Sequence, residues 1–496
     1  MVLGFNSLRR TEEATVAWLM EPHRCPGLFY GTRAQDGYLI RIRTPGGGLN
    51  AQQGRAIATL AQRWGSEAIQ VTNRANLQIR SVDPTPTPEI FQMLQTLGLA
   101  AGDPSIDHLR NVMASPTAGI DPIELIDTRP FVQALDNYLQ SHPELASLPA
   151  KFSIGIDGGG AVGIGTRSEI KWEHRYNEIQ LSAILVEGQK YFQLALGGDK
   201  QLQNTQVLIQ PDDCVPVVAA LAQVYLEYVS GATPAQPKPR MKHLLQDWGM
   251  ERYLQYVNQH LLSPLRPIAD CALPAPTQPY AHLGIHPQRQ AGLVYIGIHL
   301  KLGQLSATQL HGLVQLSETF GSGSVVLTPW QTLLLPDIPE ALVTQVLHHL
   351  SSLGWVVSEN RVDQAIAACA GKPGCAASAT HTQPLAIALG DYLRDQLKLE
   401  CPVNIHLTGC PKSCAQPSPA EITLLGTTMN YSGENEENYH IYVGNNYLGD
   451  VTGAELPLQI GKLLAFYEQH RQTPEESFGE FADRKKLHKN FLHSDK

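Results

Sequence analysis

Two stretches of the chain, one in each half, share the same order of apolar and polar positions. They are residues 37–80 and 292–335, and Leu49 in the first aligns with Leu305 in the second, 256 positions later. Each stretch has an apolar run typical of a strand, a Gly-containing turn, an amphipathic segment typical of a helix, and a second β-rich run. The pattern predicts a β–α–β unit that occurs once in each half. The alternative is chance similarity between two common units.

The two copies differ most in the run that closes the unit. In the first copy, every second position is polar or cationic: Arg74, Asn76, Gln78 and Arg80. At the first three of those positions the second copy has Trp330, Thr332 and Leu334. Because alternate residues of a strand share one face, we expect a cationic face in the first copy and a largely apolar face in the second. Such a difference is typical of a duplicated scaffold with a single active site.

Pro-rich segments at residues 234–239 and 264–279 indicate a linker between the two copies. A longer segment of mixed helix and strand pattern follows each copy. With 496 residues the chain is too long for one ordinary core. We therefore expect six regions: half-domain 1 over 20–98, α/β domain 1 over 99–233, a linker over 234–280, half-domain 2 over 281–350, α/β domain 2 over 351–480, and a frayed tail over 481–496.

Charge and composition argue against several classes of protein. The formal net charge of −9 is unfavourable for a general nucleic-acid binder. No uninterrupted apolar run reaches the roughly 18 residues that a membrane-spanning helix needs. Charged side chains near the N-terminus interrupt the apolar run of a secretory signal, namely Arg9, Arg10, Glu12 and Glu13. We expect a cytoplasmic monomer with no membrane or nucleic-acid partner.

Four of the eight cysteines have a spacing that favours a metal centre. Five residues separate Cys369 from Cys375, three separate Cys410 from Cys414, and 34 residues lie between the pairs. Four thiolates are the ligands of a [4Fe–4S] cluster. A structural zinc site usually has about two to four residues between the cysteines of each pair. Disulfides are rare in a chain without a secretion signal, so iron and sulfide are favoured.

The cysteine spacing and the duplicated unit together resemble the sirohaem-dependent nitrite and sulfite reductase family, over residues 24–480. The resemblance implies an α+β fold, in which a ferredoxin-like half-domain is duplicated about a pseudo-twofold axis and joined by a larger mixed α/β domain. It also implies a [4Fe–4S] cluster on the four cysteines. Cys414 matches the family cysteine that bridges the cluster to the iron of sirohaem. The pocket is expected to hold sirohaem or another mononuclear iron centre.

Within this family, several segments are most similar to the precorrin-3B synthases of cobalamin biosynthesis. They are residues 24–28, 36–47, 72–80, 115–122, 148–160, 369–375 and 414–420. Sulfite reductases carry a Lys-Phe-Lys sequence whose lysines bind the substrate anion, whereas this chain has Lys151-Phe152-Ser153. The resemblance implies hydroxylation and γ-lactone formation on precorrin-3A with O₂, with electrons from an external reductase, ferredoxin or NADH. The alternatives are a ferredoxin-dependent nitrite or sulfite reductase and a tetrapyrrole carrier without catalytic activity.

Cationic residues are expected to hold the carboxylates of a tetrapyrrole, because the planar guanidinium group meets a carboxylate with two hydrogen bonds. By resemblance, the residues expected to be catalytic are Arg74, Arg110 and Lys151. The residues expected to bind the cofactor are Arg41, Arg43, Asn76, Gln78, Arg80 and Cys414. Other residues are expected to be structural: Cys25, Cys214, Cys271, the buried thiol Cys401, and the core histidine His406.

Overall fold

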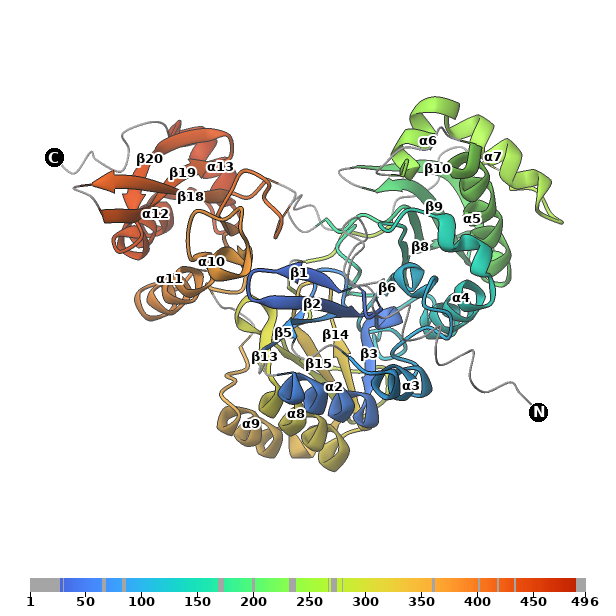
Figure 1. Cartoon of the computed structure of the whole chain (residues 1–496), viewed down its shortest axis with the longest axis horizontal. Helices are drawn as coiled ribbons and strands as arrows, with labels where there is room; N and C mark the ends of the chain where they lie inside the picture. Colours follow the sequence, from blue (N-terminus) through green and yellow to red (C-terminus); the bar gives the residue numbers. More distant parts are fainter. Residues whose placement is uncertain are drawn as a thin grey trace.

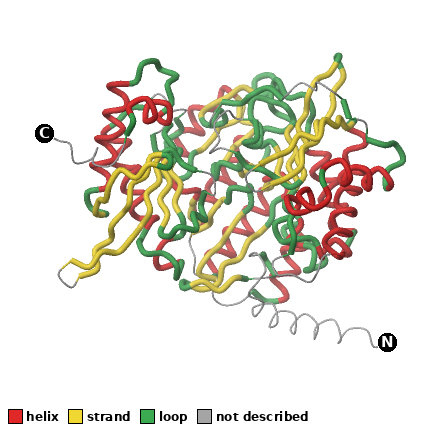
Figure 2. Tube along the Cα trace, turned by 90° about the horizontal axis from the view of Figure 1, so that it is seen from above, coloured by secondary structure: helices red, strands yellow, loops and turns green. Residues whose placement is uncertain are grey.

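In the computed structural model, two large domains lie on opposite sides of a central pair of half-domains (Figure 1). Seen from above, the helices of the two large domains lie towards opposite ends of the molecule (Figure 2). The described residues contain four five-stranded sheets. These residues are 27–29, 31–64, 68–82, 86–167, 174–198, 201–231, 238–265, 267–268, 274–278, 280–358, 362–399, 402–416, 419–431 and 434–487.

The two half-domains have the same order of elements. Half-domain 1 contains β1 (Thr32–Ala34), β2 (Gly37–Ile42), β3 (Gly48–Asn50), α2 (Ala51–Arg63), β4 (Ala68–Val71), β5 (Leu77–Val82) and α3 (Pro88–Thr96). Half-domain 2 contains β11 (Gly284–Pro287), β12 (Leu293–Ile298), β13 (Gln304–Ser306), α8 (Ala307–Phe320), β14 (Ser324–Leu327), β15 (Leu333–Pro339) and α9 (Val343–Ser352). The duplication that the hydrophobic pattern predicts is therefore confirmed.

The half-domains exchange one strand each. Their sheets have the orders β1-β2-β5-β4-β13 and β11-β12-β15-β14-β3. Leu305 of β13 lies opposite Ile69 of β4, and Leu49 of β3 lies opposite Val325 of β14. The shift of 256 positions relates one pair to the other, because Leu305 corresponds to Leu49 and Val325 corresponds to Ile69. The exchange is pseudo-symmetric, and it joins both half-domains into one hydrophobic core.

The equivalent helices α2 and α8 both begin with a capping box. The side chain of Asn50 accepts a hydrogen bond from the backbone N–H of Gln53, and the Gln53 side chain accepts one from the N–H of Asn50. Ser306 and Gln309 repeat both hydrogen bonds, again 256 positions later. These capping boxes satisfy N–H groups that have no partner within the first turn of a helix. They fix where each helix begins after the exchanged strand.

The larger domains are duplicated as well. α/β domain 1 contains β6 (Val112–Ala114), α4 (Arg129–Ser141), β7 (Ile154–Asp157), β8 (Ile179–Val186), β9 (Gln189–Gly198), β10 (Gln201–Ile209) and α5 (Cys214–Gly231). α/β domain 2 contains β16 (Ile366–Ala368), α10 (Gly371–Gly374), α11 (Thr382–Gln396), β17 (Ile405–Thr408), β18 (Ile422–Tyr431), β19 (Glu434–Val443), β20 (Asn446–Thr452), α12 (Leu456–His470) and α13 (Phe478–Lys485). In each sheet, two parallel strand pairings precede two antiparallel ones.

Part of the predicted linker is folded. Within 234–280, the chain forms α6 (Met241–Trp248) and α7 (Met250–Gln259). Their apolar residues pack into the core of α/β domain 1, because they recur at helical spacing: Met241, Leu244, Leu245, Tyr253, Leu254 and Val257. The predicted tail also differs, since α13 runs to Lys485 and Phe481 is fully buried. The prolines on either side of these helices led to the prediction of a linker, although the apolar residues between them recur at helical spacing.

Helix α5 is long and apolar enough to cross a membrane when judged by length and composition alone. However, 56% of its apolar window is buried inside the molecule. Val218, Leu221 and Tyr225 are among its residues that pack into the core of α/β domain 1. The helix therefore has the environment of a core helix.

Candidate active site

The first cysteine of each predicted pair follows one of two adjacent parallel strands. Cys369 comes directly after β16, and Cys410 follows β17 with only Gly409 between them. The carboxyl ends of parallel strands meet at one edge of a sheet, where ligands of open α/β sheets bind. The backbone N–H of Gly409 donates a hydrogen bond to Sγ of Cys369 at 3.3 Å. The two loops are therefore in contact, through the kind of hydrogen bond that tunes iron–sulfur clusters.

The other two cysteines come from the same loops. Cys375 directly follows α10, and Cys414 lies four residues after Cys410. Burial and the nearby thiols of Cys410, Cys369 and Cys375 raise the pKa of Cys414, as expected for four neighbouring thiols. Among the described residues, no group of three or more His, Cys, Asp or Glu side chains is arranged to hold a metal ion. The donor set fits a four-thiolate cluster, but the loops do not form a closed coordination sphere.

A cavity of about 300 Å³ lies beside these loops, and Cys369 and Cys414 are part of its lining. The cationic and amide side chains in its lining are Arg41, Gln70, Asn73, Gln78, Arg80, Arg175, Gln331, Gln364, Asn404 and Gln416. Cations next to two of the predicted cluster ligands fit the carboxylate fringe of a tetrapyrrole. The volume is at the lower end for small-ligand pockets, so a whole tetrapyrrole needs room beyond it.

Four of the predicted cofactor-binding side chains line this cavity, namely Arg41, Gln78, Arg80 and Cys414. Nη2 of Arg41, in β2, donates a hydrogen bond to Oε1 of Gln78 at 3.0 Å, and Nε2 of Gln78 donates to Oε1 of Gln70 at 3.2 Å. In β5, Gln78 and Arg80 flank Ile79, which is fully buried. Since strand residues alternate between faces, Gln78 and Arg80 share the face that lines the cavity.

Arg74 and Asn76 do not share this face, which corrects the expectation of one continuous strand. Strand β5 begins only at Leu77, and residues 72–76 form a hydrogen-bonded turn. Ala75 has a φ of 54°, which lies outside the strand region. Asn76 is buried in this turn and is not among the residues that line the cavity. The alternation of polar and apolar residues continues through Arg74 and Asn76, although these two residues lie before the strand begins.

The guanidinium group of Arg74 points towards the segment before β8. It donates hydrogen bonds to the backbone carbonyl oxygen of Tyr176 at 2.7 Å and to the side chain of Asn177. Burial and the positive charge of Arg240 lower the pKa of Arg74 to about 10. Arg74 is not among the residues that line the cavity. Its catalytic role stays a prediction, and its visible contacts stabilise a loop.

The remaining predicted residues also lie away from the cavity. Arg110 is 2% exposed and makes two hydrogen bonds of 2.9 Å with the carboxylate of Asp136 in α4. Arg43 is 3% exposed and lies 3.4 Å from the carboxylate of Asp107. Lys151 is exposed just before β7. The structure therefore places Arg43 and Arg110 in buried ion pairs, and it does not bring Lys151 to the other candidates.

The lining residues outside the predicted site include Arg175, Tyr280, His299 and Trp330. Arg175 comes from the loop before β8, and the other three come from half-domain 2 or the segment before it. Trp330 stands 256 positions after Arg74, and its ring centre is 4.8 Å from that of buried His282. The alignment of the two copies identified Trp330 as the apolar counterpart of Arg74. Arg175 lies in a loop, where no repeating pattern of apolar and polar residues could have predicted its position at the cavity.

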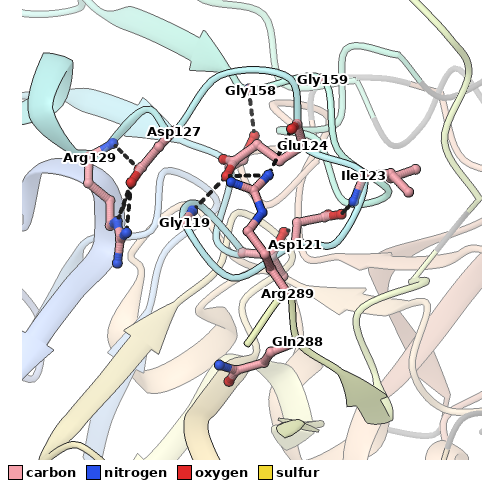
Figure 3. A network of polar contacts seen from close by, with 12 residues as sticks. Gly119, Asp121, Ile123, Glu124, Asp127, Arg129, Gly158, Gly159, Gln288 and Arg289 are labelled. Atoms are coloured by element: carbon pink, nitrogen blue, oxygen red, sulfur yellow. Dashed lines mark hydrogen bonds and ion pairs between the residues drawn. The ribbon is translucent and has the colours of Figure 1, made fainter. Parts of the chain in front are cut away.

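In α/β domain 1, the loop that corresponds to the first cysteine loop is filled by polar contacts (Figure 3). The carboxylate of Glu124 accepts a hydrogen bond from the N–H of Gly119 at 2.8 Å. Arg289 of half-domain 2 donates to the carbonyl oxygen of Glu124 at 2.8 Å and lies 3.8 Å from its carboxylate. Burial raises the pKa of Glu124 to about 7. A Cβ on Gly158 would lie 2.8 Å from Oε1 of Glu124, so this loop is closely packed.

The residues expected to be structural can be placed only in part. Cys214 is buried at the start of α5, and burial raises the pKa of its thiol to about 12. His406 is 2% exposed in β17, and burial lowers its pKa to about 4, so its imidazole is neutral near pH 7. Both have the environment of core residues. Three further cysteines lie outside the described residues: Cys25, Cys271 and Cys401.

Comparison with protein-family models gives two matches. The nitrite and sulphite reductase 4Fe-4S domain matches residues 105–265, and the nitrite/sulfite reductase ferredoxin-like half domain matches residues 30–97 and 286–353. The half-domain matches coincide with the two copies that exchange strands. The four cysteines, within 369–414, lie in the second copy of the domain that the first model matches.

Named relatives cover most of the chain. A ferredoxin–nitrite reductase of Synechococcus elongatus is 33% identical over 448 residues, which are 87% of this chain and 86% of the relative. The chloroplastic ferredoxin–nitrite reductase of Spinacia oleracea is 27% identical, over 87% of this chain and 74% of the relative. A ferredoxin-dependent sulfite reductase of Mycolicibacterium paratuberculosis is 28% identical, over 90% of this chain and 78% of the relative. The precorrin-3B synthase reading has no support among these names.

Among solved structures, the NirA protein of Mycobacterium tuberculosis matches with a TM-score of 0.75. The match covers 90% of this chain and 83% of that protein, at 24% sequence identity. A likeness at this level of identity concerns the fold. The expected α+β fold with duplicated ferredoxin-like half-domains is confirmed.

Proposed function

Because the chain belongs to the nitrite and sulfite reductase family, we propose that it reduces nitrite to ammonium with electrons from an external ferredoxin. The observation that carries this proposal is the shared cavity. Two thiols of the cysteine set and the cations Arg41 and Arg80 line the same space. A cluster held by these thiols would therefore lie beside a wall whose cations attract anions.

The cofactors of the family are a [4Fe–4S] cluster and sirohaem. Cys369, Cys375, Cys410 and Cys414 would hold the cluster, because they are the thiols of two touching loops. When bound, the two cofactors supply the electrons and an iron site for the substrate. Both oxygens of nitrite leave as water and its nitrogen leaves as ammonium, so the reaction also consumes protons from solvent.

The side chains of the chain itself bind and orient. Arg41, held by Gln78, supplies a fixed positive charge for carboxylates of the macrocycle or for the anion. Tyr280 and Trp330 are buried and line the wall that half-domain 2 contributes. Such an aromatic wall excludes water, which strengthens electrostatic attraction inside the cavity.

Ser153 supports nitrite over sulfite as the substrate. It stands where sulfite reductases have the second lysine of Lys-Phe-Lys. Ser153 is 1% exposed, and its Oγ accepts a hydrogen bond from the N–H of Glu178 at 3.4 Å. A buried hydroxyl group in this position offers no cation to an external anion. The identity of 33% to a nitrite reductase, against 28% to a sulfite reductase, points the same way.

Precorrin-3B synthase is the second candidate, and two observations favour it. Arg110 and Lys151, which by resemblance would face a small anion, lie outside the cavity. A site without them suits a large substrate that brings its own carboxylates. The loop from Cys369 to Cys375 also has the sequence that resembles the synthases. The named relatives are reductases, so nitrite reduction is the better supported function.

The test is turnover by anaerobically purified protein with reduced ferredoxin and either nitrite or sulfite. We expect ammonium to appear in proportion to the nitrite consumed, with much slower release of sulfide from sulfite. Cys414→Ser is the control, because it removes one thiol of the cavity and should abolish turnover without unfolding the domain. Faster turnover of sulfite than of nitrite would overturn the choice of substrate. No turnover of either anion would overturn the proposal.

A further inference from the structure

Arg80 is the side chain through which half-domain 1 holds the first cysteine loop. Its Nε and Nη2 donate hydrogen bonds to the carboxylate of Asp36 at 3.1 and 3.2 Å. Nη2 also donates to the carbonyl oxygen of Gly374 at 2.8 Å. Gly374 directly precedes Cys375. The guanidinium group is thus fixed by its own half-domain on one side, and on the other side it holds a loop that carries a cluster ligand.

The contact is closely fitted. A Cβ on Gly374 would lie 2.7 Å from Nη2 of Arg80 and 3.4 Å from a carboxylate oxygen of Asp36. The hydroxyl group of Ser81 donates a further hydrogen bond to Asp36 at 3.4 Å. The side chains of Arg80 and Asp36 are only 21% and 19% exposed, so water screens their charges in part. A side chain at position 374 would therefore displace the guanidinium group of Arg80 from the loop.

In the other half of the molecule an arginine also contacts a loop of a large domain, but from a position that is not equivalent to that of Arg80. Arg289 of half-domain 2 donates to the carbonyl oxygen of Glu124, in the loop after β6 (Figure 3). Arg80 of half-domain 1 donates to the carbonyl oxygen of Gly374, in the loop after β16. In each half, an arginine docks on the loop that follows the first parallel strand of a large domain. The two arginines are not related by the duplication, since Pro336 stands 256 positions after Arg80. The loop that Arg80 contacts is the one that contains two cysteines of the predicted set.

We propose that Arg80 is a positioning residue for the iron–sulfur cluster, which fixes the Cys369–Cys375 loop against half-domain 1 and places a positive charge beside it. The proposal concerns the cluster alone and does not depend on which substrate is reduced. Reduction adds negative charge to a cluster, so a nearby guanidinium group favours the reduced state and a nearby carboxylate opposes it. Loss of Arg80 and loss of the Asp36 charge should therefore shift the reduction potential in opposite directions.

The experiment uses the anaerobically purified full chain with its cluster, in the variants Arg80→Met and Asp36→Asn. Arg33→Met is the matched control, because Arg33 is an exposed arginine of β1 in the same sheet. The potential is measured by a redox titration followed by electron paramagnetic resonance. Cluster loss in the presence of an iron chelator is followed by visible absorbance. Circular dichroism and thermal unfolding show whether each variant is folded.

We expect Arg80→Met to have a more negative potential and to lose its cluster roughly tenfold faster, as for the loss of one charge-assisted hydrogen bond. Asp36→Asn should have a more positive potential, and Arg33→Met should match the unmodified chain. A purely structural role would not give opposite shifts. Equal potentials in Arg80→Met and Arg33→Met, or shifts of the same sign in Arg80→Met and Asp36→Asn, would overturn the proposal.

Gly374→Ala gives a second test if Arg80→Met does not fold. The new methyl group would displace the guanidinium group without changing any charge. We expect faster cluster loss than in the unmodified chain. If Arg80→Met does fold, the two effects should not add in the double variant, because both break the same contact. Additive effects, or unchanged cluster loss in Gly374→Ala, would contradict the role of this contact.

Discussion

Ser115 and Cys369 occupy equivalent positions in the two copies of the large domain. Oγ of Ser115 accepts a hydrogen bond from the N–H of Gly158 at 3.1 Å, and Sγ of Cys369 accepts one from the N–H of Gly409 at 3.3 Å. Each acceptor directly follows the first strand of its sheet, and each glycine follows the second. The two copies therefore share one hydrogen bond between their loops, with oxygen as the acceptor in one copy and sulfur in the other.

Exchanging these two atoms tests the cluster site. Cys369→Ser keeps a hydrogen-bond acceptor but removes a thiolate ligand, so we expect the loss of most of the bound iron and sulfide. Ser115→Cys should bind no additional iron, because residues 116–178 contain no cysteine that could complete a ligand set. Iron and acid-labile sulfide are measured in anaerobically purified protein. Full iron content in Cys369→Ser would contradict the assignment of Cys369 as a ligand.

Arg110 is expected to act on stability. Arg110→Ala would leave the buried carboxylate of Asp136 without its partner, which costs about 3–5 kcal/mol of the free energy of unfolding. The control is Arg129→Ala, which breaks the more exposed pair with Asp127 and should cost about 0–1 kcal/mol. Denaturant unfolding measures both effects. An Arg110→Ala variant as stable as the unmodified chain but without turnover would instead support the catalytic role.

Glu124 should make the stability of α/β domain 1 depend on pH. Its pKa is raised from the usual 4.5 to about 7, so between these values the folded state binds more protons than the unfolded state. The free energy of unfolding contributed by Glu124 therefore falls as the pH rises from 4.5 to about 7, and is constant above that range.

Glu124→Gln removes this contribution and keeps an oxygen that can accept from the N–H of Gly119. We expect the variant to lose part of the fall in stability across this pH range. Its stability relative to the unmodified chain should be highest above pH 7. Denaturation midpoints across the range provide the measurement. Parallel pH profiles for the two proteins would show that Glu124 does not titrate as its burial implies.

Arg41 should be important for the macrocycle and not for the cluster. It lines the cavity, and its Nη2 donates a hydrogen bond to Gln78 of the neighbouring strand β5. Arg41→Met should lower the affinity for sirohaem roughly tenfold, the effect of one lost charge-assisted hydrogen bond. The ratio of extractable sirohaem to acid-labile sulfide measures this effect, with Arg33→Met as the control. A fall in sulfide equal to the fall in sirohaem would mean that Arg41 supports the fold.

The sequence predicted the duplicated half-domains well, because strands and helices each have their own spacing of apolar residues over a short stretch of chain. It could not predict that β3 and β13 change places, since strand pairing between halves depends on contacts distant in sequence. The spacing also grouped the cysteines into two pairs, and in the structure each pair belongs to the segment that follows one of two adjacent strands. The extension of β5 back to Arg74 was wrong, because the turn over 72–76 has polar residues at the same alternate positions as a strand.

Residue type alone did not predict what each cationic side chain does. Arg41, Arg80 and Arg110 looked alike in the sequence, but the partner carboxylate decides what each does. Arg110 has Asp136 in the domain interior, and Arg80 has Asp36 at the cysteine loop. Such partners become visible only when distant segments are folded together. Arg175 was missed for the same reason, since nothing in its neighbourhood in the sequence places it at a cavity.

The most direct test of the proposed function compares two reactions of one anaerobic preparation. One sample receives reduced ferredoxin and nitrite, and the other receives precorrin-3A, the same reductant and O₂. Ammonium and the mass of the tetrapyrrole are measured after both. Nitrite reduction predicts ammonium in the first sample and unchanged precorrin-3A in the second. Oxygen incorporated into the tetrapyrrole, with no ammonium from nitrite, would contradict the account.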